Sequence, residues 1–491
     1  MSPNLNLNLN LNLNLRVVLG ERWPDIEVTG LCEHTTEVFQ GCAFFAVALD
    51  PIVAKQHAND ALNDGAKLVI SQHRLEREDC YAYPELLAER GVLAATFYGN
   101  PGEQMQCIGV TGTNGKTSVA YYIASLSDLL RVPCGYIGTL GWGRLDELVD
   151  PNMTTPNPTA LQRMLATLRE NGCRRVAIEV SSHALHQHRA HAVPFTVGIF
   201  TNLSREHLDY HHTMESYLAA KMQLFTEFPL RSAILFDQDP LSHTIEEQCD
   251  AEVLRYGRGP VKDSTETCTW SIDAPSEFGP EVIEWQIANQ RIRARVPMVA
   301  DFAIDNLTAA IAVLVTFEHE GREIQRVLPD VASVPGRMQI VVRSGAHGTI
   351  VVDYAHTPDA LEKVLSALIP KGKGRLICVV GCGGDRDQGK RPQMAATAAK
   401  HADVVWLTSD NPRSEDPLKI IHDMQCGVQE SDVRIELNAD RREAICDAIK
   451  QAEVQDVVLI AGKGHERYQE IKGQKYPFDD VAVAKAALVG V

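Results

Sequence analysis

The stretch of residues 109–118, GVTGTNGKTS, places a glycine-rich turn and a lysine between two patterns of regular structure. The preceding MQCIGV is an apolar run typical of a buried strand, and the following VAYYIASLSDLL has the apolar spacing of a helix. A helix that begins here points its positive N-terminal end and its backbone N–H groups at the turn. Gly112 and Gly115 permit the positive φ angles and the close approach that a phosphate cradle requires. The pattern therefore predicts that the phosphates of a nucleotide are held at this turn.

Two side chains in the turn strengthen this prediction. Lys116 adds a positive point charge, and Thr117 offers a hydroxyl oxygen to Mg²⁺. The general P-loop spacing needs glycine at position 110, where this chain has Val110, with its glycine one residue earlier at Gly109. A chance glycine turn is the alternative interpretation. It is disfavoured because strand, turn, Lys-Thr pair and helix occur together.

The bulk properties of the chain exclude several classes of protein. Its 491 residues are enough for about three domains, and 45% hydrophobic with 23% charged residues is an ordinary composition for a globular protein. No apolar run is long enough to cross a bilayer. A net charge of −17 argues against non-specific binding of nucleic acid. The twelve cysteines show no CxxC framework, so we expect reduced thiols in a cytoplasmic protein.

The N-terminus alternates Asn and Leu from Asn4 to Leu15. This alternation mimics a strand but carries no turn signal, and it lacks the basic region and continuous apolar core of a secretory signal. We expect residues 1–15 to be a disordered, low-complexity leader.

The remaining chain is predicted to form an α/β protein of three domains. Residues 16–102 have short apolar runs typical of a small α/β domain. In residues 103–335 the runs RVAIEV, TVGIFTNL and SAILF alternate with helical patterns, which predicts a largely parallel sheet flanked by helices. The polar stretch at residues 258–278 is predicted to be a surface excursion. Residues 336–491 repeat the strand and helix alternation and are predicted to be Rossmann-like.

Three polar motifs follow strands of this last domain. GCGGDRD, SDNPR and GKGHE each come after an apolar run. Ligands of parallel sheets bind beyond the carboxyl ends of the strands, so we expect the three loops to meet there. Turn chemistry explains their glycines but not Arg386, Asp410, Arg413 and Glu466 together.

The motifs GVTGTNGKTS, TTPNP, EVSSHAL, FTNLSREHLDYH, YLAAK, PGRM, DYAHTPDAL, GCGGDRDQGKRP, DNPR and AGKGHE occur in the order found in the Mur ligases, which this chain resembles over residues 105–469. The resemblance is greatest to the branch that adds the third residue of the peptidoglycan precursor. It implies a central P-loop-type parallel-sheet ATPase domain, an N-terminal domain for the UDP substrate and a C-terminal Rossmann-like domain for the amino acid. It also implies a cytoplasmic monomer that acts on small molecules, without nucleic acid or membrane insertion.

The implied reaction joins an amino acid to UDP-N-acetylmuramoyl-L-alanyl-D-glutamate and consumes ATP. Joining a carboxylate to an amine in water is uphill, so ATP first converts the carboxylate into an acyl phosphate. Bringing two anions together demands cations, which Lys116 and Mg²⁺ supply. The resemblance implies that the catalytic residues are Lys116, Glu179, His207 and Lys221, the last one carbamylated, and that the metal ligands are Thr117, Glu179, His207 and Lys221.

Each of these residues also has a plainer interpretation. Glu179 and His207 fit ordinary loop polarity, and Lys221 lies in a helical pattern where lysine is normally a solvated surface charge. The His and Asp residues of EHLDYHH suggest a zinc site as an alternative. This alternative is poor, because the sequence has neither matching cysteines nor an HExxH spacing.

The resemblance further assigns binding residues. Those for ATP are Gly112, Thr113, Asn114, Gly115, Lys116, Thr117, Ser118, Asn306 and Arg337. Those for the UDP-dipeptide are Thr35, Thr154, Thr155, Ser181, Gln187 and Arg189. Two departures from the family pattern occur: His34, Thr35 and Thr36 stand where the family usually has Asp-Ser-Arg, and Ala303 stands where it commonly has Asn.

The amino acid added is expected to be meso-diaminopimelate, because DNPR matches the diaminopimelate type. The residues implied to bind it are Arg386, Asp410, Asn411, Pro412, Arg413, Gly462 and Glu466. Arg413 can hold the extra carboxylate of diaminopimelate in a bidentate manner, whereas lysine would leave the guanidinium unpaired. A plain Asn-Pro turn is the alternative for DNPR. Folylpolyglutamate synthase, MurF and MurD are the rival enzymes, and a non-catalytic nucleotide-binding scaffold is the rival of another class.

Overall fold

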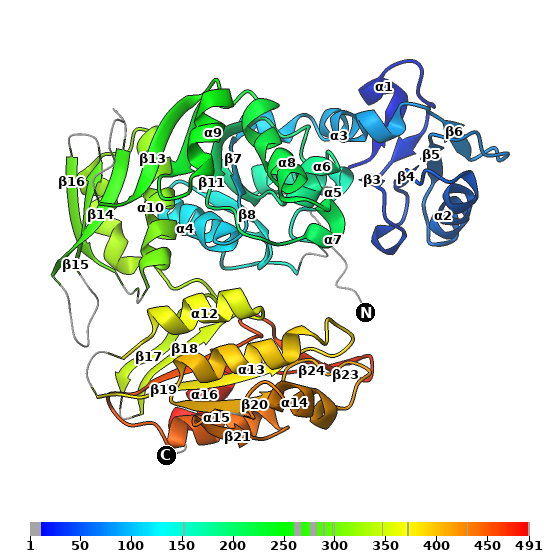
Figure 1. Ribbon diagram of the computed structural model, residues 1–491. Coiled ribbons are helices and arrows are strands. Elements are labelled where there is room, and N and C mark those ends of the chain that lie inside the picture. The colour runs from blue at the N-terminus through cyan, green and yellow to red at the C-terminus, as the bar shows by residue number, and fades with distance from the viewer. Residues whose placement is uncertain are drawn as a thin grey trace. The chain divides into compact units, whose positions relative to one another are not determined.

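A computed structural model describes residues 11–150, 153–259, 267–274, 282–287, 290–296, 298, 300–345, 347–370, 373–429 and 431–489 (Figure 1). By its contacts the chain divides into two compact units. The first comprises Met1–Thr269, Gln286–Arg291 and Asn306–Val327, and the second Trp270–Trp285, Ile292–Asp305 and Leu328–Val491.

The N-terminal part of the first unit contains a parallel four-stranded sheet. Its strands are β3 (Leu31–Cys32), β4 (Ala43–Ala46), β5 (Leu68–Ser71) and β6 (Cys80–Ala82). The accompanying helices are α2 (Pro51–Asn63) and α3 (Leu86–Phe97), with short turns at η1 (Thr35–Glu37) and η2 (Pro101–Gln104). The small α/β arrangement expected from the apolar runs is therefore present.

The end of the Asn-Leu repeat belongs to this fold. β1 (Leu13–Asn14) pairs with β2 (Glu27–Val28), and Leu15 is fully buried at the start of α1 (Leu15–Leu19). The Asn14 side chain caps that helix by accepting from the backbone N–H groups of its first turn. The prediction of a disordered leader up to Leu15 is wrong for these last residues, because the repeat supplies a strand, a cap and a core side chain. Residues 1–10 lie outside the described part of the chain.

The central sheet has ten strands among the described residues, in the order β16-β15-β14-β13-β12-β11-β7-β10-β8-β9. Its strands are β7 (Gln106–Thr111), β8 (Cys134–Gly138), β9 (Gly141–Gly143), β10 (Arg175–Glu179), β11 (Phe195–Phe200), β12 (Ser232–Phe236), β13 (Glu252–Arg258), β14 (Thr267–Ala274), β15 (Val282–Ile287) and β16 (Gln290–Arg295). From β13 to β8 the neighbouring strands are parallel. The predicted parallel sheet is confirmed.

The helices that alternate with these strands are α4 (Lys116–Leu129), α5 (Pro158–Glu170), α6 (Ser182–His186), α7 (Leu208–His211), α8 (Met214–Thr226), α9 (Leu241–Gln248), α10 (Asp301–Thr316) and α11 (Gly321–Val327), with η3 at Leu328–Asp330. The TTPNP motif ends in a helix start as expected, because Asn157 caps α5 and Pro158 is its first residue.

The stretch at residues 258–278 is not a plain surface excursion. It contains β14, whose Cys268 and Trp270 are buried. The indole Nε1 of Trp270 donates to Asp305 Oδ1 at 2.7 Å. Threonines and serine around these two apolar residues make the segment look polar in sequence, and burial of Cys268 and Trp270 outweighs that polarity. Residues 260–266 and 275–281 lie outside the described part of the chain.

The C-terminal sheet has the order β17-β18-β22-β19-β20-β21, in which only β17 is antiparallel to its neighbour among the described strands. Its strands are β17 (Gln339–Gly345), β18 (Gly348–Asp353), β19 (Leu376–Cys382), β20 (Val404–Ser409), β21 (Arg434–Leu437) and β22 (Val457–Ala461), and a hairpin follows at β23 (Tyr468–Ile471) and β24 (Gln474–Pro477). The helices are α12 (Pro358–Ala367), α13 (Lys390–His401), α14 (Pro417–Gln425), α15 (Arg441–Lys450) and α16 (Asp480–Val489). This is the Rossmann-like alternation that the sequence predicted.

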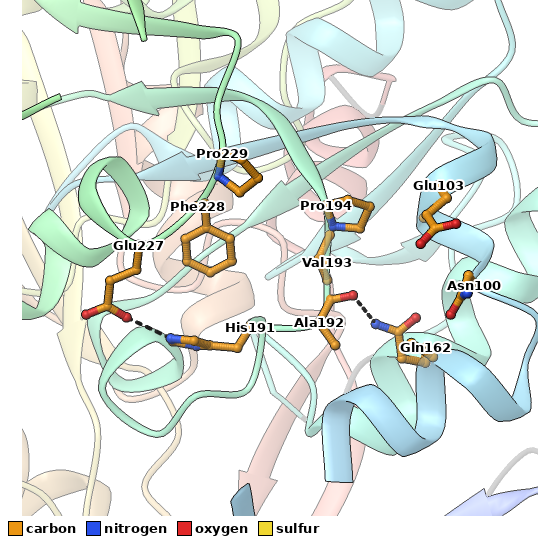
Figure 2. Close-up of a pocket in the computed structure, with 12 residues that line it drawn as sticks. Asn100, Glu103, Gln162, His191, Ala192, Val193, Pro194, Glu227, Phe228 and Pro229 are labelled. Atoms are coloured by element: carbon orange, nitrogen blue, oxygen red, sulfur yellow. Dashed lines mark hydrogen bonds and ion pairs between the residues drawn. The ribbon is translucent and has the colours of Figure 1, made fainter. Parts of the chain in front are cut away.

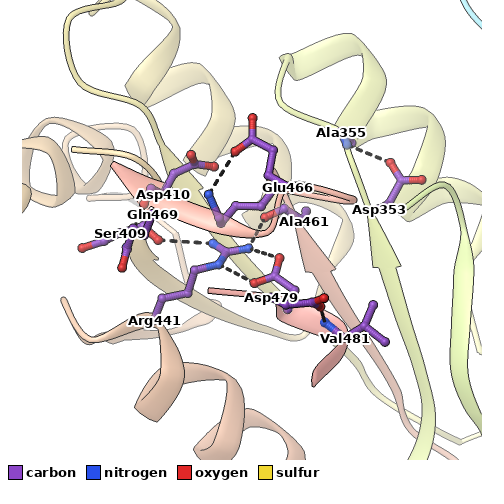
Figure 3. Close-up of polar contacts among 12 residues, drawn as sticks. Asp353, Ala355, Ser409, Asp410, Arg441, Ala461, Glu466, Gln469, Asp479 and Val481 are labelled. Carbon is purple, nitrogen blue, oxygen red and sulfur yellow. Dashed lines mark hydrogen bonds and ion pairs between the residues drawn. The ribbon is translucent and has the colours of Figure 1, made fainter. Parts of the chain in front are cut away.

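A buried ion pair holds the carboxyl ends of two of these strands. Arg441 donates to both carboxylate oxygens of Asp480, at 2.8 and 2.7 Å, and both side chains are fully buried. The same guanidinium donates to the backbone oxygens of Ser409 at 3.3 Å and Ala461 at 2.9 Å (Figure 3). Arg441 therefore connects the last residue of β20 and the last residue of β22 through a single guanidinium group.

We expect Arg441→Met to destabilise the second unit by about 3–5 kcal/mol, because it leaves the Asp480 carboxylate buried without its partner. Urea unfolding followed by circular dichroism measures the change. The control is Arg434→Met, since its exposed pair with Glu436 contributes about 0–1 kcal/mol. The double variant Arg441→Met with Asp480→Leu should recover part of the loss. Equal stability of Arg441→Met and the control would contradict a structural role for the pair.

None of the helices in the described residues is long and apolar enough to cross a membrane. All twelve cysteines are free thiols, as expected. Two of them, Cys32 and Cys42, bring their sulfur atoms within 3.3 Å of each other in the core beside β4.

Candidate active site

The glycine-rich turn joins β7 to α4 and is tightly packed. Gly112 has a φ of 144°, and a Cβ at this position would lie 1.9 Å from Thr201 Oγ1. Gly115 has a φ of 88°, and its Cβ would lie 2.5 Å from Asn306 Oδ1. Both glycines are thus required by conformation and by space. The structure also brings Asn306, predicted as an ATP contact, onto the turn.

We expect Gly112→Ala to weaken ADP binding by about tenfold or more, since the added methyl must displace Thr201 and distort the turn. Isothermal titration with ADP gives the affinity. Gly172→Ala is the matched control, because Gly172 also has a positive φ, of 78°, but open space around its Cβ position. If both variants bound ADP like the parent chain, the tight turn would not be the nucleotide site.

Two lysine amines converge on one carbonyl oxygen of the turn. Lys116 Nζ donates to Gly112 O at 2.9 Å and to Thr113 O at 2.8 Å. Lys221 Nζ, from α8, donates to the same Gly112 O at 2.7 Å. Lys221 is only 2% exposed, so it is not the solvated surface charge of the plainer interpretation. Burial, helped by the charge of Lys116, holds the pKa of Lys221 well below its usual value.

Glu179 is the centre of a buried oxygen cluster. It is the last residue of β10 and is fully buried. Its Oε1 accepts from Tyr136 Oη at 2.5 Å and from Thr139 N at 2.8 Å, and its Oε2 accepts from Thr117 Oγ1 at 2.9 Å. A hydroxyl and a carboxylate are oxygen ligands of the kind that Mg²⁺ prefers, so Thr117 and Glu179 would fit this ion in chemistry.

His207 lies in the loop after β11, with a left-handed backbone at φ 56°. Its ring is 4.9 Å from that of His183, and its Nε2 is 3.8 Å from Glu206 Oε2. Burial lowers the pKa of His207, which favours the neutral imidazole with its lone pair. Among the described contacts none joins His207 to Glu179. The structure thus brings Thr117, Glu179, Lys116 and Lys221 to the turn but does not place His207 in contact with them.

The residues predicted to hold the UDP-dipeptide share one edge of the same unit. Thr155 Oγ1 donates to Glu179 O at 2.7 Å and accepts from Ser181 N at 3.1 Å. Arg189 Nη1 donates to Thr155 O at 3.1 Å, and its Nε donates to Gln187 Oε1 at 2.9 Å. These hydrogen bonds connect the group directly to the last residue of β10.

The predicted contacts at Thr154 and Thr35 lie near this group. Thr154 Oγ1 is 3.2 Å from Thr139 Oγ1, which itself contacts Glu179. Thr35 begins the η1 turn, and Glu37 at the end of that turn accepts from Asn157 Nδ2 at 2.9 Å. The divergent N-terminal segment is therefore attached to the TTPNP loop.

In the second unit, described by itself, the three polar loops meet as predicted. Arg413 Nη1 donates to Gly384 O at 2.7 Å, which joins the DNPR loop to GCGGDRD. Asn411 Nδ2 donates to Glu466 Oε2 at 2.8 Å, which joins DNPR to GKGHE. The fully buried Lys463 donates to both Asn411 Oδ1 and Glu466 Oε2 at 3.0 Å. The order β22-β19-β20 in the sheet places these loops side by side.

The other residues predicted to bind the amino acid differ in how closely they are packed and how exposed they are. A Cβ on Gly462, whose φ is 111°, would lie 2.8 Å from Asp410 Oδ2, so that the backbone and this carboxylate are in close contact. Pro412 O packs closely against Gly384: a Cβ added at Gly384 would lie only 1.9 Å from this oxygen. Arg386 is exposed in its loop. Arg337, predicted to reach ATP, lies over the Tyr354 ring at 4.5 Å.

Sequence reasoning missed several residues of the site. Lys463 was quoted within GKGHE but given no role, although an internal lysine between two glycines was a usable signal. Tyr136 and Thr139 hold the Glu179 carboxylate from β8 and the loop after it. No motif marks these two residues, because their importance comes from the pairing of β8 with β10.

The Mur ligase middle domain matches residues 110–314, and the Mur ligase, glutamate ligase domain matches residues 336–464. The chain belongs to the Mur ligase family. This Mur ligase is 42% identical to the UDP-N-acetylmuramoyl-L-alanyl-D-glutamate--2,6-diaminopimelate ligase of Pseudomonas aeruginosa, over 94% of this chain and 96% of the relative. It is 46% identical to the protein of the same name from Coxiella burnetii, over 81% of each chain.

Solved structures agree with the family assignment. A structure of UDP-N-acetylmuramoyl-L-alanyl-D-glutamate--2,6-diaminopimelate ligase matches this Mur ligase with a TM-score of 0.70 and 32% identity, over 98% of this chain and 99% of the other. MurF from Acinetobacter baumannii matches with a TM-score of 0.67 at 16% identity, over 93% and 96% of the two chains, which shows a shared fold.

Proposed function

We propose that this Mur ligase uses ATP to join meso-diaminopimelate to UDP-N-acetylmuramoyl-L-alanyl-D-glutamate during synthesis of the peptidoglycan precursor. The proposal rests on the DNPR loop. Hydrogen bonds from Asn411 to Glu466 and from Arg413 to Gly384 O fix this loop between GKGHE and GCGGDRD. Relatives that bear the name of this reaction match more than nine-tenths of the chain, which supports it.

The chemistry follows from the charges at the turn. The D-glutamyl carboxylate attacks the γ-phosphorus of ATP, giving an acyl phosphate and ADP. The diaminopimelate amine then attacks the acyl carbon, and the tetrahedral intermediate expels phosphate and loses a proton. Lys116 and the backbone N–H groups at the start of α4 stabilise the negative charge of the transferred phosphoryl group.

Mg²⁺ fits this site through the oxygens of Thr117 and Glu179. We assign it also to His207 and to Lys221 as a carbamate. When bound, the ion neutralises charge on the phosphates of ATP. Burial, with the positive charge of Lys116 nearby, disfavours the ammonium form of Lys221, and only the neutral amine adds CO₂, which supports the carbamate.

The remaining assignments follow the three predicted segments. We infer that residues 16–102 bind the UDP end through Thr35, that residues 103–335 bind ATP and the dipeptide, and that residues 336–491 bind diaminopimelate. The supports are the hydrogen bonds among Thr155, Ser181 and Arg189 and those of the DNPR loop. We also infer a monomer that works in the cytoplasm.

A phosphate-release assay tests the function. It combines ATP, Mg²⁺ and the UDP-dipeptide with meso-diaminopimelate, and then replaces the diaminopimelate by lysine or by glutamate. We expect release with diaminopimelate and at most a small fraction of that rate with the others. Equal release with lysine would overturn the assigned amino acid. No release with any amine, in protein that binds ADP, would favour a non-catalytic scaffold.

A further inference from the structure

A cluster of side chains that could hold a metal lies on the same turn as Gln187 and Arg189, away from the Thr117 and Glu179 oxygens. The sequence HQHRAH, residues 186–191, forms the turn after α6, and the end of α8 lies beside it. His188 Nδ1 is 3.0 Å from His191 Nε2, which is 2.8 Å from Glu227 Oε2. All three side chains are exposed, and their ligand atoms lie within 4.8 Å of one another. Within the described residues this is the one group of three such side chains.

The three side chains already share their ligand atoms through hydrogen bonds. His191 Nε2 is 2.8 Å from Glu227 Oε2, and His188 Nδ1 is 3.0 Å from His191 Nε2 and 3.3 Å from His191 Nδ1. In one tautomer His191 Nε2–H donates to Glu227 and His188 Nδ1–H donates to His191 Nδ1. A metal ion competes with this arrangement by replacing those hydrogens. A cation placed among the three atoms accepts a lone pair from each of them.

We propose that His188, His191 and Glu227 bind a transition-metal ion of the zinc class, separate from the Mg²⁺ site. Two imidazoles and a carboxylate are ligands that suit Zn²⁺. Tetrahedral ligands at zinc distances of 2.0–2.1 Å are about 3.3 Å apart, so the 3.0 and 2.8 Å of the two pairs that include His191 require movements of a few tenths of an ångström, and the His188–Glu227 pair lies within 4.8 Å. Water completes the coordination, because all three side chains are exposed.

The surroundings supply access and support. His191 and Glu227 line a pocket of about 250 Å³ that extends past Phe228 and Pro194 to Glu103 (Figure 2). Gln162 Nε2 donates to Ala192 O at 3.1 Å and fixes the backbone next to His191. A bound ion would join the turn after α6 to the end of α8.

The backbone of His188 offers a clean variant. His188 has a φ of 54°, its N–H donates to Leu185 O, and the N–H of Arg189 donates to Ala184 O. This is a Schellman motif with histidine at the left-handed position that glycine usually occupies. His188→Gly therefore removes the ligand while suiting the backbone, so its metal-free melting temperature should not fall.

The test is a zinc titration by calorimetry with millimolar Mg²⁺ present to occupy the other site. The background is Cys426→Ser, since an exposed thiol also binds zinc. We expect the parent to bind Zn²⁺ at micromolar concentration, with a rise in melting temperature, and to give the intense visible absorption of tetrahedral Co²⁺. Each of His188→Gly, His191→Gln and Glu227→Gln should weaken binding by about tenfold or more, and His57→Gln should not.

Two results would overturn the proposal. One is the same zinc affinity in the parent and all three ligand variants. The other is a parent that binds no zinc at micromolar concentration. Neither result depends on ligase turnover, so the proposed function is tested separately.

Discussion

Lys221→Ala is expected to lower kcat on the order of a thousandfold, which is close to abolishing turnover. The Lys221 side chain is buried, and its Nζ donates to Gly112 O in the glycine-rich turn at 2.7 Å. Its depressed pKa favours the neutral amine that adds CO₂ to form a carbamate and release a proton. Alanine removes the amine that is proposed to carry this carbamate, and with it a proposed ligand of Mg²⁺.

The experiment measures phosphate release at saturating ATP and Mg²⁺, with and without added bicarbonate. Bicarbonate should not restore Lys221→Ala, because the variant has no amine to modify. Lys400→Ala is the control, since Lys400 pairs with Glu362 at the surface. In ¹³C-bicarbonate the parent should show a carbamate resonance that the variant lacks. Near-normal turnover of a correctly folded Lys221→Ala would refute the assignment.

Arg413→Ala is expected to raise KM for diaminopimelate about a hundredfold, with a smaller change in kcat. Arg413 is held in place, because its Nη1 donates to Gly384 O and its Nε is 3.4 Å from Glu470 Oε2. The guanidinium is proposed to pair with the far carboxylate of diaminopimelate. Alanine leaves that carboxylate without its partner.

Steady-state kinetics with varied diaminopimelate measure the effect. Arg413→Lys keeps the charge without the bidentate fork, so we expect an intermediate KM. KM for ATP should not change, which separates lost recognition from collapse of the loop. Arg434→Ala provides an exposed arginine as the control. Unchanged KM and unchanged selectivity against lysine would contradict the assignment.

Much of the fold was predictable because buried parallel strands are continuous apolar runs. MQCIGV, RVAIEV, SAILF and RLICVVG each match a strand to within one residue. The loops after them were predictable as well, because the carboxyl ends of parallel strands share one edge. The order at the end of the Asn-Leu repeat and at β14 was not predictable, since neither segment carries a local sign of the strands that flank it in the sheet, which are β2 for β1 and β13 and β15 for β14.

The candidate site divides in the same way. Lys116, Thr117 and Glu179 were found because each lies in or beside a motif at a strand end. The convergence of Lys116 and Lys221 on Gly112 O was not visible, because 109 positions separate Lys221 from that carbonyl. Tyr136 and Thr139 were missed because they reach Glu179 through the pairing of β8 with β10, and this pairing leaves no local pattern in the sequence. His188 and His191 were overlooked although HQHRAH is unusually rich in imidazole.

The buried Arg441 fork has a mechanical consequence for selectivity. The guanidinium donates hydrogen bonds to the carbonyl oxygens of Ser409 and Ala461. These residues immediately precede Asp410, which begins the DNPR loop, and Gly462, which begins the GKGHE loop. The starts of the DNPR and GKGHE loops are therefore hydrogen-bonded to the same guanidinium, so a thermal displacement of one loop moves the other as well. We expect the selectivity between amino acids to persist on heating until the Arg441–Asp480 ion pair breaks, and to be lost together with the fold of the second unit.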